Sequence, residues 1–373
     1  MLLAYWYIRY LGEPLFSMRL LIVAKRRPQQ RDLIERPYGR FYHLPVGLAA
    51  LGHEVQVLLV SHHHLPSQHV RRAEVEWFSD DVRTLGPVML YRALKDKTRT
   101  FRPDWVIGMS DAHYGWLAQQ LAKSVGARLA VDAYDNYEAY MPWNVPLHRM
   151  WRRAVRQADL VTAAGPQLAN LLQSHRKDRE PPHVIPMAAD PEFIPLDRRE
   201  SRRQLGLEPD AELIGYIGSW SKSRGSSMLL DAFRELSSSR PELRLVISGR
   251  PPEKILQEPG VLGTGYVADA KLPALVNALN VACVITANTR FGRYSYPGKL
   301  CEAMACRVPV VATSTAPVDW MLGGRMQHLI PTGDVEAFVH RAQELLSNPI
   351  ADYGARITWE AQAQKLSRLL AGD

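Results

Sequence analysis

The chain has 373 residues, 46% of them hydrophobic, and a formal net charge of +8 at pH 7. This length predicts about two domains, each with a sizeable core. No apolar run reaches the ~20 residues that a membrane-spanning helix needs, so we expect a soluble or peripheral protein.

The charge excess lies entirely in the first half of the chain. Residues 1–183 carry 25 Lys and Arg against 17 Asp and Glu, whereas residues 184–373 carry 21 of each. This asymmetry favours an anionic partner for the first half, such as a membrane surface, a lipid phosphate or a nucleic acid. For any one basic cluster, a solvated surface is the simpler interpretation.

Residues 1–17 are apolar and aromatic, and they have neither the basic start nor the small-residue cleavage site of a secretory signal. Two interpretations are open. The stretch is an interfacial segment with Trp6 at the level of lipid headgroups, or the translation start is set too early. A strand directly after Met18 slightly favours the second.

Strands predicted at residues 19–24 and 54–60 enclose a helix predicted at 41–50. This βαβ opening indicates a parallel, doubly wound sheet. The loop after the first strand lies at the carboxyl edge of the sheet, where open α/β sheets bind ligands, and it contains Gly39. The run of histidines at 62–64 suggests a metal site, but adjacent side chains on an extended chain point to opposite faces. We therefore expect a loop without a metal there.

Polar residues follow two further predicted strands, at 105–108 and 128–131. Asp111 comes after the first, and Asp132, Tyr134 and Asp135 come after the second. They are placed to hold hydroxyl groups of a sugar or an acceptor. Helix capping is the alternative role, and it explains one or two of the aspartates.

A helix predicted at residues 147–158 carries four arginines at i, i+3, i+4 and i+7 spacing. This spacing places them in one stripe on the helix surface. The stripe is the best candidate in the chain for contact with a membrane or a phosphate, and it consists of Arg149, Arg152, Arg153 and Arg156.

A proline-rich segment, 186–195, reads as a hinge before a second α/β unit. Strands are predicted there at 213–217, 244–248, 282–286 and 310–313, and an amphipathic helix at 359–370 ends the chain. Residues 263–268 match the pattern GxGxxG/A, but Pro259-Gly260 breaks any preceding strand, so we do not expect a dinucleotide site. The three cysteines lack metal-ligand spacing and are predicted core residues, namely Cys283, Cys301 and Cys306.

Residues 290–313 read as a loop, a helix and a buried strand. Pro297 suits a helix start, and a helix amino terminus binds anions through its free N–H groups and its dipole. Lys299 adds a positive charge there. Glu302, expected in the first turn, could accept hydrogen bonds from sugar hydroxyls. A nucleotide site and a charged loop before a core helix are about equally favoured by this stretch alone.

Four motifs in order resemble those of one family. Residues 184–193 resemble the hinge pattern V-I-P-N-G-V-D-x-x-x-F, and residues 217–225 resemble G-R-x-x-x-x-K-G. Residues 262–267 resemble F-x-G-Y-V, and residues 302–313 resemble E-A-M-A-C-G-x-P-V-V-A-T. Over nearly all of residues 19–371 the chain resembles retaining glycosyltransferases of the GT-B architecture, group 1 or family 4 type.

The resemblance implies an α/β fold of two Rossmann-like domains that face each other across a cleft. It predicts an N-terminal extension at 1–17, an acceptor domain at 18–183, a donor-nucleotide domain at 184–354, and a C-terminal helix, within 355–373, that crosses back to the first domain. The implied activity is transfer of a sugar from a nucleoside diphosphate sugar to a saccharide or lipid-linked acceptor with retention, in cell-surface polysaccharide or glycoconjugate synthesis. Neither a metal, a cofactor nor a nucleic acid is expected, and the expected location is cytoplasmic, with peripheral contact at the inner face of a membrane.

The resemblance also implies the site residues. Tyr134, Asp135 and Asp111 are expected on the catalytic and acceptor side. The residues expected to bind the nucleotide sugar are Gly39, Ser219, Arg224, Tyr266, Tyr294, Pro297, Gly298, Lys299 and Glu302.

The chain departs from the family pattern at several positions. Tyr294 stands where the family has the first of two glutamates, Ser219 stands in place of an arginine, and Arg224 in place of a lysine. These departures favour, as an alternative, a catalytically degenerate GT-B protein that acts as a binding or scaffold subunit. A GT-B epimerase or phosphorylase is a third interpretation.

Overall fold

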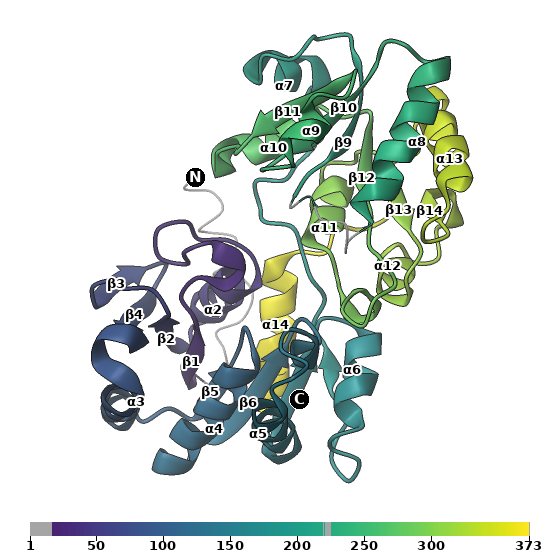
Figure 1. Cartoon of the computed structure of the whole chain (residues 1–373). Helices are drawn as coiled ribbons and strands as arrows, with labels where there is room; N and C mark the ends of the chain where they lie inside the picture. The colour runs from purple at the N-terminus through teal and green to yellow at the C-terminus, as the bar shows by residue number, and fades with distance from the viewer. Residues whose placement is uncertain (1–16, 219, 221–224, 373) are drawn as a thin grey trace. The chain divides into compact units, whose positions relative to one another are not determined.

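The computed structural model describes residues 17–218, 220 and 225–372. The chain divides into two compact units, each with its own sheet (Figure 1). The first contains the chain up to Pro186 together with the part from Trp359 onward, and the second runs from Met187 to Thr358. The sequence-based boundaries, after residues 183 and 354, lie a few residues away from these.

The first unit is built on an eight-stranded sheet with the order β3-β4-β2-β1-β5-β6-β7-β8. All neighbouring strands are parallel except the antiparallel pair β3 and β4. The strands are β1 (Arg19–Lys25), β2 (Glu54–Ser61), β3 (Gln68–Arg72), β4 (Val75–Asp81), β5 (Trp105–Gly108), β6 (Arg128–Ala133), β7 (Leu160–Ala163) and β8 (His183–Val184).

Central strands of this sheet are buried on both faces. Residues 20–24 of β1 have no exposed surface, which explains why the strand is a continuous apolar run and not an alternating one. The helices of the unit are α2 (Arg40–Ala50), α3 (Val82–Phe101), α4 (Ala112–Val125), α5 (Val145–Gln157), α6 (Pro166–Gln173) and α14 (Trp359–Ala371).

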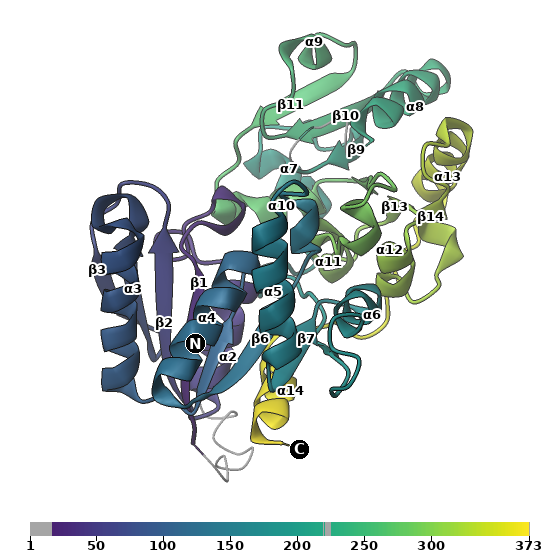
Figure 2. The same cartoon turned by 60° about the horizontal axis from the view of Figure 1, so that its bottom comes forward.

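The last helix, α14, belongs to the first unit, although the chain has passed through the second unit before it. It packs beside α2 in both views (Figures 1 and 2). The packing is close, because a Cβ added to Gly47 of α2 would come within 2.5 Å of the Cβ of Ala363. In addition, the indole nitrogen of Trp105 donates a hydrogen bond to the carbonyl of Leu370, at 3.1 Å.

The β3–β4 hairpin and α3 were not predicted from the sequence. Ala73 and Glu74, in the hairpin turn, both adopt positive φ angles, of 50° and 58°. Such a turn is normally marked by Asn-Gly or Asp-Gly, and neither pair is present. In α3 the pair Gly86-Pro87 interrupts the helical pattern, and Gly86 has a non-helical φ of 70°.

The second unit has a six-stranded parallel sheet with the order β11-β10-β9-β12-β13-β14. The strands are β9 (Glu212–Tyr216), β10 (Leu243–Ser248), β11 (Val261–Gly265), β12 (Val281–Val284), β13 (Val310–Thr313) and β14 (Leu329–Ile330). β11 begins at Val261, directly after Pro259-Gly260, so only two of its residues precede the GxGxxG/A match, as the sequence indicated. Its glycines lie within the strand, and α10 (Leu272–Asn277) does not begin at them.

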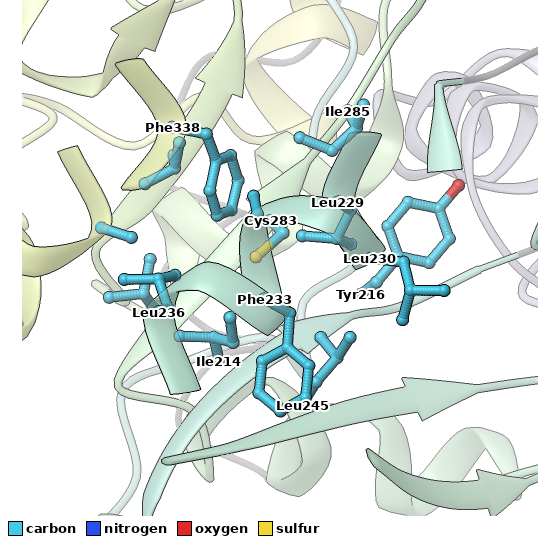
Figure 3. Close-up of a cluster of buried hydrophobic side chains, with 14 of the residues drawn as sticks. Ile214, Tyr216, Leu229, Leu230, Phe233, Leu236, Leu245, Cys283, Ile285 and Phe338 are labelled. Atoms are coloured by element: carbon cyan, nitrogen blue, oxygen red, sulfur yellow. The ribbon is translucent and has the colours of Figure 1, made fainter. Parts of the chain in front are cut away.

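The core on one face of this sheet lies beneath α8 (Ser226–Ser239) and α13 (Val335–Ser347) (Figure 3). Leu229 and Phe233 of α8 lie one turn apart and pack toward Ile214 and Leu245 of the sheet. Each such side chain, when fully buried, contributes about 1.5–3 kcal/mol to stability. Cys283 is buried in the same cluster, as predicted. Shorter helices complete the unit: α7 (Arg198–Gln204), α9 (Glu253–Leu256), α11 (Gly298–Ala305) and α12 (Ala316–Met321).

Candidate functional site

The second unit has a topological switch point at β9. This strand has β12 as its neighbour, and the chain continues from β9 to β10 on one side of the pair and from β12 to β13 on the other. Open α/β sheets bind ligands at the carboxyl ends of the strands at such a point. Gly218 lies just beyond the end of β9, and α11 follows the loop after β12.

Lys299 lies at this switch point. Its side-chain nitrogen is 4.2 Å from the centre of the Tyr216 ring, which is fully buried at the end of β9. A Cβ added to Gly218 would stand 3.4 Å from the same nitrogen. Gly218 has a φ of +132°, which L side chains rarely adopt, and its amide donates to Ser248 Oγ at 3.1 Å. The loop after β9 and the start of α11 therefore hold a cation at the carboxyl edge of the sheet.

The helix that carries Lys299 begins where the sequence indicated, within one residue. Pro297 is the N-cap of α11 and Gly298 is its first helical residue, and no side chain caps this end among the described residues. The amide groups at a helix amino terminus attract anions. The amino terminus of α11 and the ammonium of Lys299 thus lie together.

Glu302 lies one turn further along α11 than predicted. Since the helix begins at Gly298, Glu302 falls in the second turn and not the first. Its side chain is half-buried. Burial, together with the negative charge of Glu302, raises the pKa of the Cys301 thiol to about 12. Cys301 is therefore a protonated thiol at neutral pH.

The other predicted donor-side residues lie in different structural environments and differ in exposure. Tyr294 ends a short 3-10 helix, η5 (Gly292–Tyr294), and is half-buried. Tyr266 follows the edge strand β11 directly and its side chain is 64% exposed. Ser219 and Arg224 lie outside the described residues.

In the first unit, Gly39 is the N-cap of α2. Its φ of 62° and ψ of −162° belong to a region that is essentially confined to glycine. A Cβ at Gly39 would meet nothing within 4 Å, so the backbone conformation and not the space requires glycine. The next residues attach this end of α2 to β6: Arg40 pairs with Asp132, and Phe41 packs edge-on against Tyr134 with ring centres 5.1 Å apart.

Two of the predicted catalytic residues meet a third residue that the sequence did not single out. The hydroxyl of Tyr140 donates to Asp135 Oδ2 at 2.6 Å and lies 3.1 Å from the hydroxyl of Tyr134. Burial, reinforced by the charge of Asp135, raises the pKa of Tyr134 above the usual value. The structure therefore groups Tyr134, Asp135 and Tyr140, and Phe41, two residues after Gly39, packs against Tyr134 of this group.

Two predicted acidic residues have structural partners. Asp132 was expected to hold sugar hydroxyls, and this was wrong, because it lies buried in an ion pair with Arg40 and accepts a hydrogen bond from Thr162. Asp111 caps α4: its carboxylate accepts from the amide of His113 at 2.9 Å and lies 3.0 Å from its ring Nδ1. The capping alternative thus accounts for Asp111, and a catalytic role for it stays a prediction.

Further basic groups lie near Asp111, and the sequence did not predict that they belong to one site. His62, which follows β2, lies 2.8 Å from the hydroxyl of Tyr114. The pKa of His62 is lowered by burial and then by Lys25 at the end of β1, with Asp111 acting in the opposite sense. Since β2, β1 and β5 are neighbours in the sheet, their polar ends meet at one edge. Strand order would have been needed to see this from the sequence.

The arginine stripe on α5 is exposed, and one of its members has an acidic partner. All four arginines are exposed, and Arg152 forms a bidentate ion pair with Glu138, at 2.7 and 2.5 Å. Just before α5, Trp143 is 76% exposed. Within the described ranges, no helix is long and apolar enough to cross a membrane. The described residues also include no group of three or more His, Cys, Asp or Glu side chains that could hold a metal ion.

Two family models match the chain. Residues 39–188 match the glycosyl transferase 4-like domain, and residues 211–348 match glycosyl transferases group 1. Together the two matches cover most of the chain, and they divide it where the structure does. The chain belongs to the group 1, family 4 type of glycosyltransferases, as the sequence motifs indicated.

Solved structures with the same architecture support the GT-B fold. Sucrose-phosphate synthase from Thermosynechococcus elongatus superposes with a TM-score of 0.76 at 17% identity, over 95% of this chain and 99% of that chain. HepE of Anabaena in complex with UDP gives a TM-score of 0.66 at 17% identity, over 94% and 95%. The predicted fold class, an α/β GT-B fold with Rossmann-like domains, is confirmed.

The curated relatives match this chain over only part of their length. The chain is 25% identical over 300 residues to the D-inositol 3-phosphate glycosyltransferase of Segniliparus rotundus, which is 70% of this chain and 65% of that protein. It is 27% identical over 197 residues to the phosphatidyl-myo-inositol mannosyltransferase of Mycobacterium leprae, which is 48% and 52%. The chain thus spans roughly half to two thirds of the length of these relatives.

Proposed function

We propose that the protein transfers a sugar from a nucleoside diphosphate sugar to a hydroxyl group of an acceptor, with retention of the anomeric configuration. One observation carries the proposal. In a chain of this family, Lys299 and the amino terminus of α11, which no described side chain caps, lie together at the switch point of the second sheet, against Gly218. This combination suits a diphosphate.

The donor is assigned to the second unit. The amides at the start of α11 and the ammonium of Lys299 hold the diphosphate and stabilise the negative charge that develops on the leaving group. Arg224 shares this role, and Ser219 offers a hydroxyl. Glu302 accepts hydrogen bonds from the ribose. Complexes of HepE of Anabaena with UDP and with UDP-glucose support a nucleotide donor for this architecture. No metal or cofactor is required in this proposal.

The reacting sugar and the acceptor are assigned to the residues of the first unit. Gly39 is assigned to the donor sugar, and Tyr134 and Asp135 orient hydroxyl groups. Asp111 is the third candidate on this side. The sugar passes through an oxocarbenium-like transition state, as in other glycosyl chemistry. The acceptor hydroxyl must then attack the face that the leaving group vacates, which is the geometric condition for retention.

The acceptor class follows from the basic groups at the carboxyl edge of the first sheet. The cation of Lys25, with the rings of His62 and His113 as candidate hydrogen-bond donors beside it, favours an acceptor that carries an anionic group. The names of the relatives, D-inositol 3-phosphate glycosyltransferase and phosphatidyl-myo-inositol mannosyltransferase, support a phosphate-bearing polyol or a lipid-linked acceptor. We place the reaction in cell-surface polysaccharide or glycoconjugate synthesis.

We also propose peripheral contact with an anionic membrane from the cytoplasmic side. Arg149, Arg153 and Arg156 supply a basic face, and the exposed Trp143 next to it suits the headgroup region. Nucleic acid is not an expected partner.

The test is a turnover assay with UDP-, GDP- and dTDP-sugars, with inositol phosphates and lipid-linked saccharides as acceptors. Release of nucleoside diphosphate together with a glycosylated product is expected for one donor, and NMR of the product should show the donor's anomeric configuration. Nucleotide binding without turnover for every donor would favour the alternative of a scaffold subunit, for which the substitutions at Tyr294 and Ser219 are the motive.

A further inference from the structure

We propose that Arg40 is a positioning residue that fixes the amino terminus of α2 against the end of β6 and so holds Gly39 beside Tyr134 and Asp135. The proposal rests on the function proposed above, because Gly39, Tyr134 and Asp135 are its assigned residues. Arg40 itself is buried, and the proposed function assigns it no contact with donor or acceptor.

The guanidinium of Arg40 forms a bidentate ion pair inside the first unit. Its Nε donates to Asp132 Oδ2 at 2.7 Å and its Nη2 donates to Asp132 Oδ1 at 2.5 Å. Both side chains are almost completely buried, with 1% and 2% of their surfaces exposed. Thr162 of β7 donates a further hydrogen bond to the same carboxylate, at 2.5 Å. A planar fork on a carboxylate fixes direction as well as distance.

The remaining nitrogen of Arg40 reaches a third element. Its Nη1 donates to the carbonyls of Ile185, at 2.7 Å, and of Pro186, at 3.3 Å. These are the last residues of the first unit before the chain enters the second. One side chain therefore joins the start of α2, the end of β6 and the segment at which the unit ends.

The next residue extends this connection to the predicted site. Phe41 packs edge-on against Tyr134, two positions after Asp132. The first two residues of α2 therefore contact β6 and its extension on both sides of Ala133. Gly39 immediately precedes them, so any shift of this turn moves Gly39 relative to Tyr134 and Asp135.

A purely stabilising role does not explain well why a charged pair, Arg40 and Asp132, occupies this buried position. Buried ion pairs can often be replaced by apolar side chains of similar volume without loss of stability. What such a replacement removes is the directional constraint. Loss of the Arg40 ion pair should therefore lower turnover more than it lowers the free energy of unfolding, and both quantities can be measured.

The decisive variant is Arg40→Met combined with Asp132→Leu, which replaces the pair without leaving a lone buried charge. We expect a folded protein whose melting temperature is close to that of the wild type and whose affinity for free nucleoside diphosphate is unchanged, since that binding is assigned to the second unit. Turnover should fall by at least about tenfold, and on the order of 10²-fold for a displacement of about 1 Å.

Arg40→Lys is the second variant, for the case that the double variant does not fold. It keeps the charge but not the fork, and we expect the same unchanged nucleotide affinity with at least about tenfold lower turnover. The matched control is Arg176→Met. Arg176 is equally buried in the same unit but donates to carbonyls at the end of α5, at Val155 and Ala158. It should lower the melting temperature without this selective loss of turnover.

Wild-type turnover in a folded double variant, or in Arg40→Lys, would overturn the proposal. So would a loss of turnover no larger than that of Arg176→Met at a matched loss of stability. Failure of the proposed function is a separate result, because the wild type itself would then show no transfer with any donor.

Discussion

The ammonium group of Lys299 lies over the ring of Tyr216, 4.2 Å from its centre, and Tyr216 is fully buried at the end of β9. A cation over an aromatic face is stabilised by about 0.5–1 kcal/mol when exposed and by about 2 kcal/mol or more when desolvated. The ring therefore fixes the position of the charge on the sheet edge. This relationship links a core residue to the group that we assign to the diphosphate.

Lys299→Met should abolish most of the turnover with little loss of stability. Removal of one contact that stabilises a developing charge typically costs about 2.7–4 kcal/mol in the barrier, or roughly 10²–10³ in kcat. Steady-state kinetics with the active nucleotide sugar measures the effect. The matched control is Lys271→Met, at an exposed lysine of the same unit, which should leave kcat unchanged. Equal kcat values for the two variants would show that Lys299 does not stabilise the charge on the leaving group.

Tyr216→Leu should weaken nucleotide binding, whereas Tyr216→Phe should not. Phenylalanine keeps the aromatic face beneath Lys299, while leucine removes it together with about 0.5–2 kcal/mol of cation–π stabilisation. Titration calorimetry with the nucleoside diphosphate, well below the melting temperature of each variant, separates them. If both variants bind alike, the ring is only a core side chain.

Glu302→Gln should raise KM for the nucleotide sugar. A hydrogen bond to a charged group contributes roughly 1.5–3 kcal/mol, so loss of the charge should raise KM by about tenfold if the ribose is the partner. The diagnostic comparison is with a 2′,3′-dideoxy donor, for which wild type and variant should differ little. A difference that persists with the dideoxy donor contradicts the assigned role.

His53 should make stability depend on pH. Its ring Nδ1 lies 3.2 Å from the donating amide of Met18 and its Nε2 lies 2.7 Å from Ser367 Oγ, so the neutral ring joins the start of β1 to α14. Burial lowers its pKa below 6.5. A lowered pKa means that the unfolded chain binds the proton first, so the stabilisation is present above pH 6.5 and is lost as pH falls through the lowered pKa.

The measurement is urea denaturation of wild type and His53→Gln between about pH 7.5 and pH 5, a range that spans the ordinary histidine pKa. The midpoint of the wild type should fall more steeply with decreasing pH than that of the variant. Parallel curves would show that His53 does not carry this dependence, and His175 and His328, whose pKa values burial also lowers, would be the next variants to compare.

The arginines of α5 should control binding to anionic vesicles unequally. Each exposed basic residue near such a surface contributes about 1 kcal/mol, so Arg149→Gln with Arg153→Gln should reduce flotation strongly and in a salt-dependent way. The matched control is Arg152→Gln combined with Glu138→Gln, because it removes a neutral ion pair and leaves the net charge unchanged. Absence of flotation by the wild type at low salt contradicts the membrane proposal.

The positions of the central strands could be predicted because their apolar runs are buried on both faces, as in β1 and β13. The hairpin of β3 and β4 could not, since its turn uses Ala73 and Glu74 without the glycine that such a turn favours. In the site, Lys299 and the start of α11 were predictable from local helix signals. Asp132 was misassigned because its partner, Arg40, is 92 positions away in the chain. Long-range pairs of this kind leave no local pattern.

The central claim is that the Lys299 end of α11 binds a nucleoside diphosphate. Its most direct test is calorimetric titration of UDP and GDP into the wild-type protein and into Lys299→Met. We expect saturable binding of one nucleotide by the wild type and a clearly weaker affinity in the variant. No binding of either nucleotide by the wild type, or equal affinities for wild type and variant, would contradict the claim.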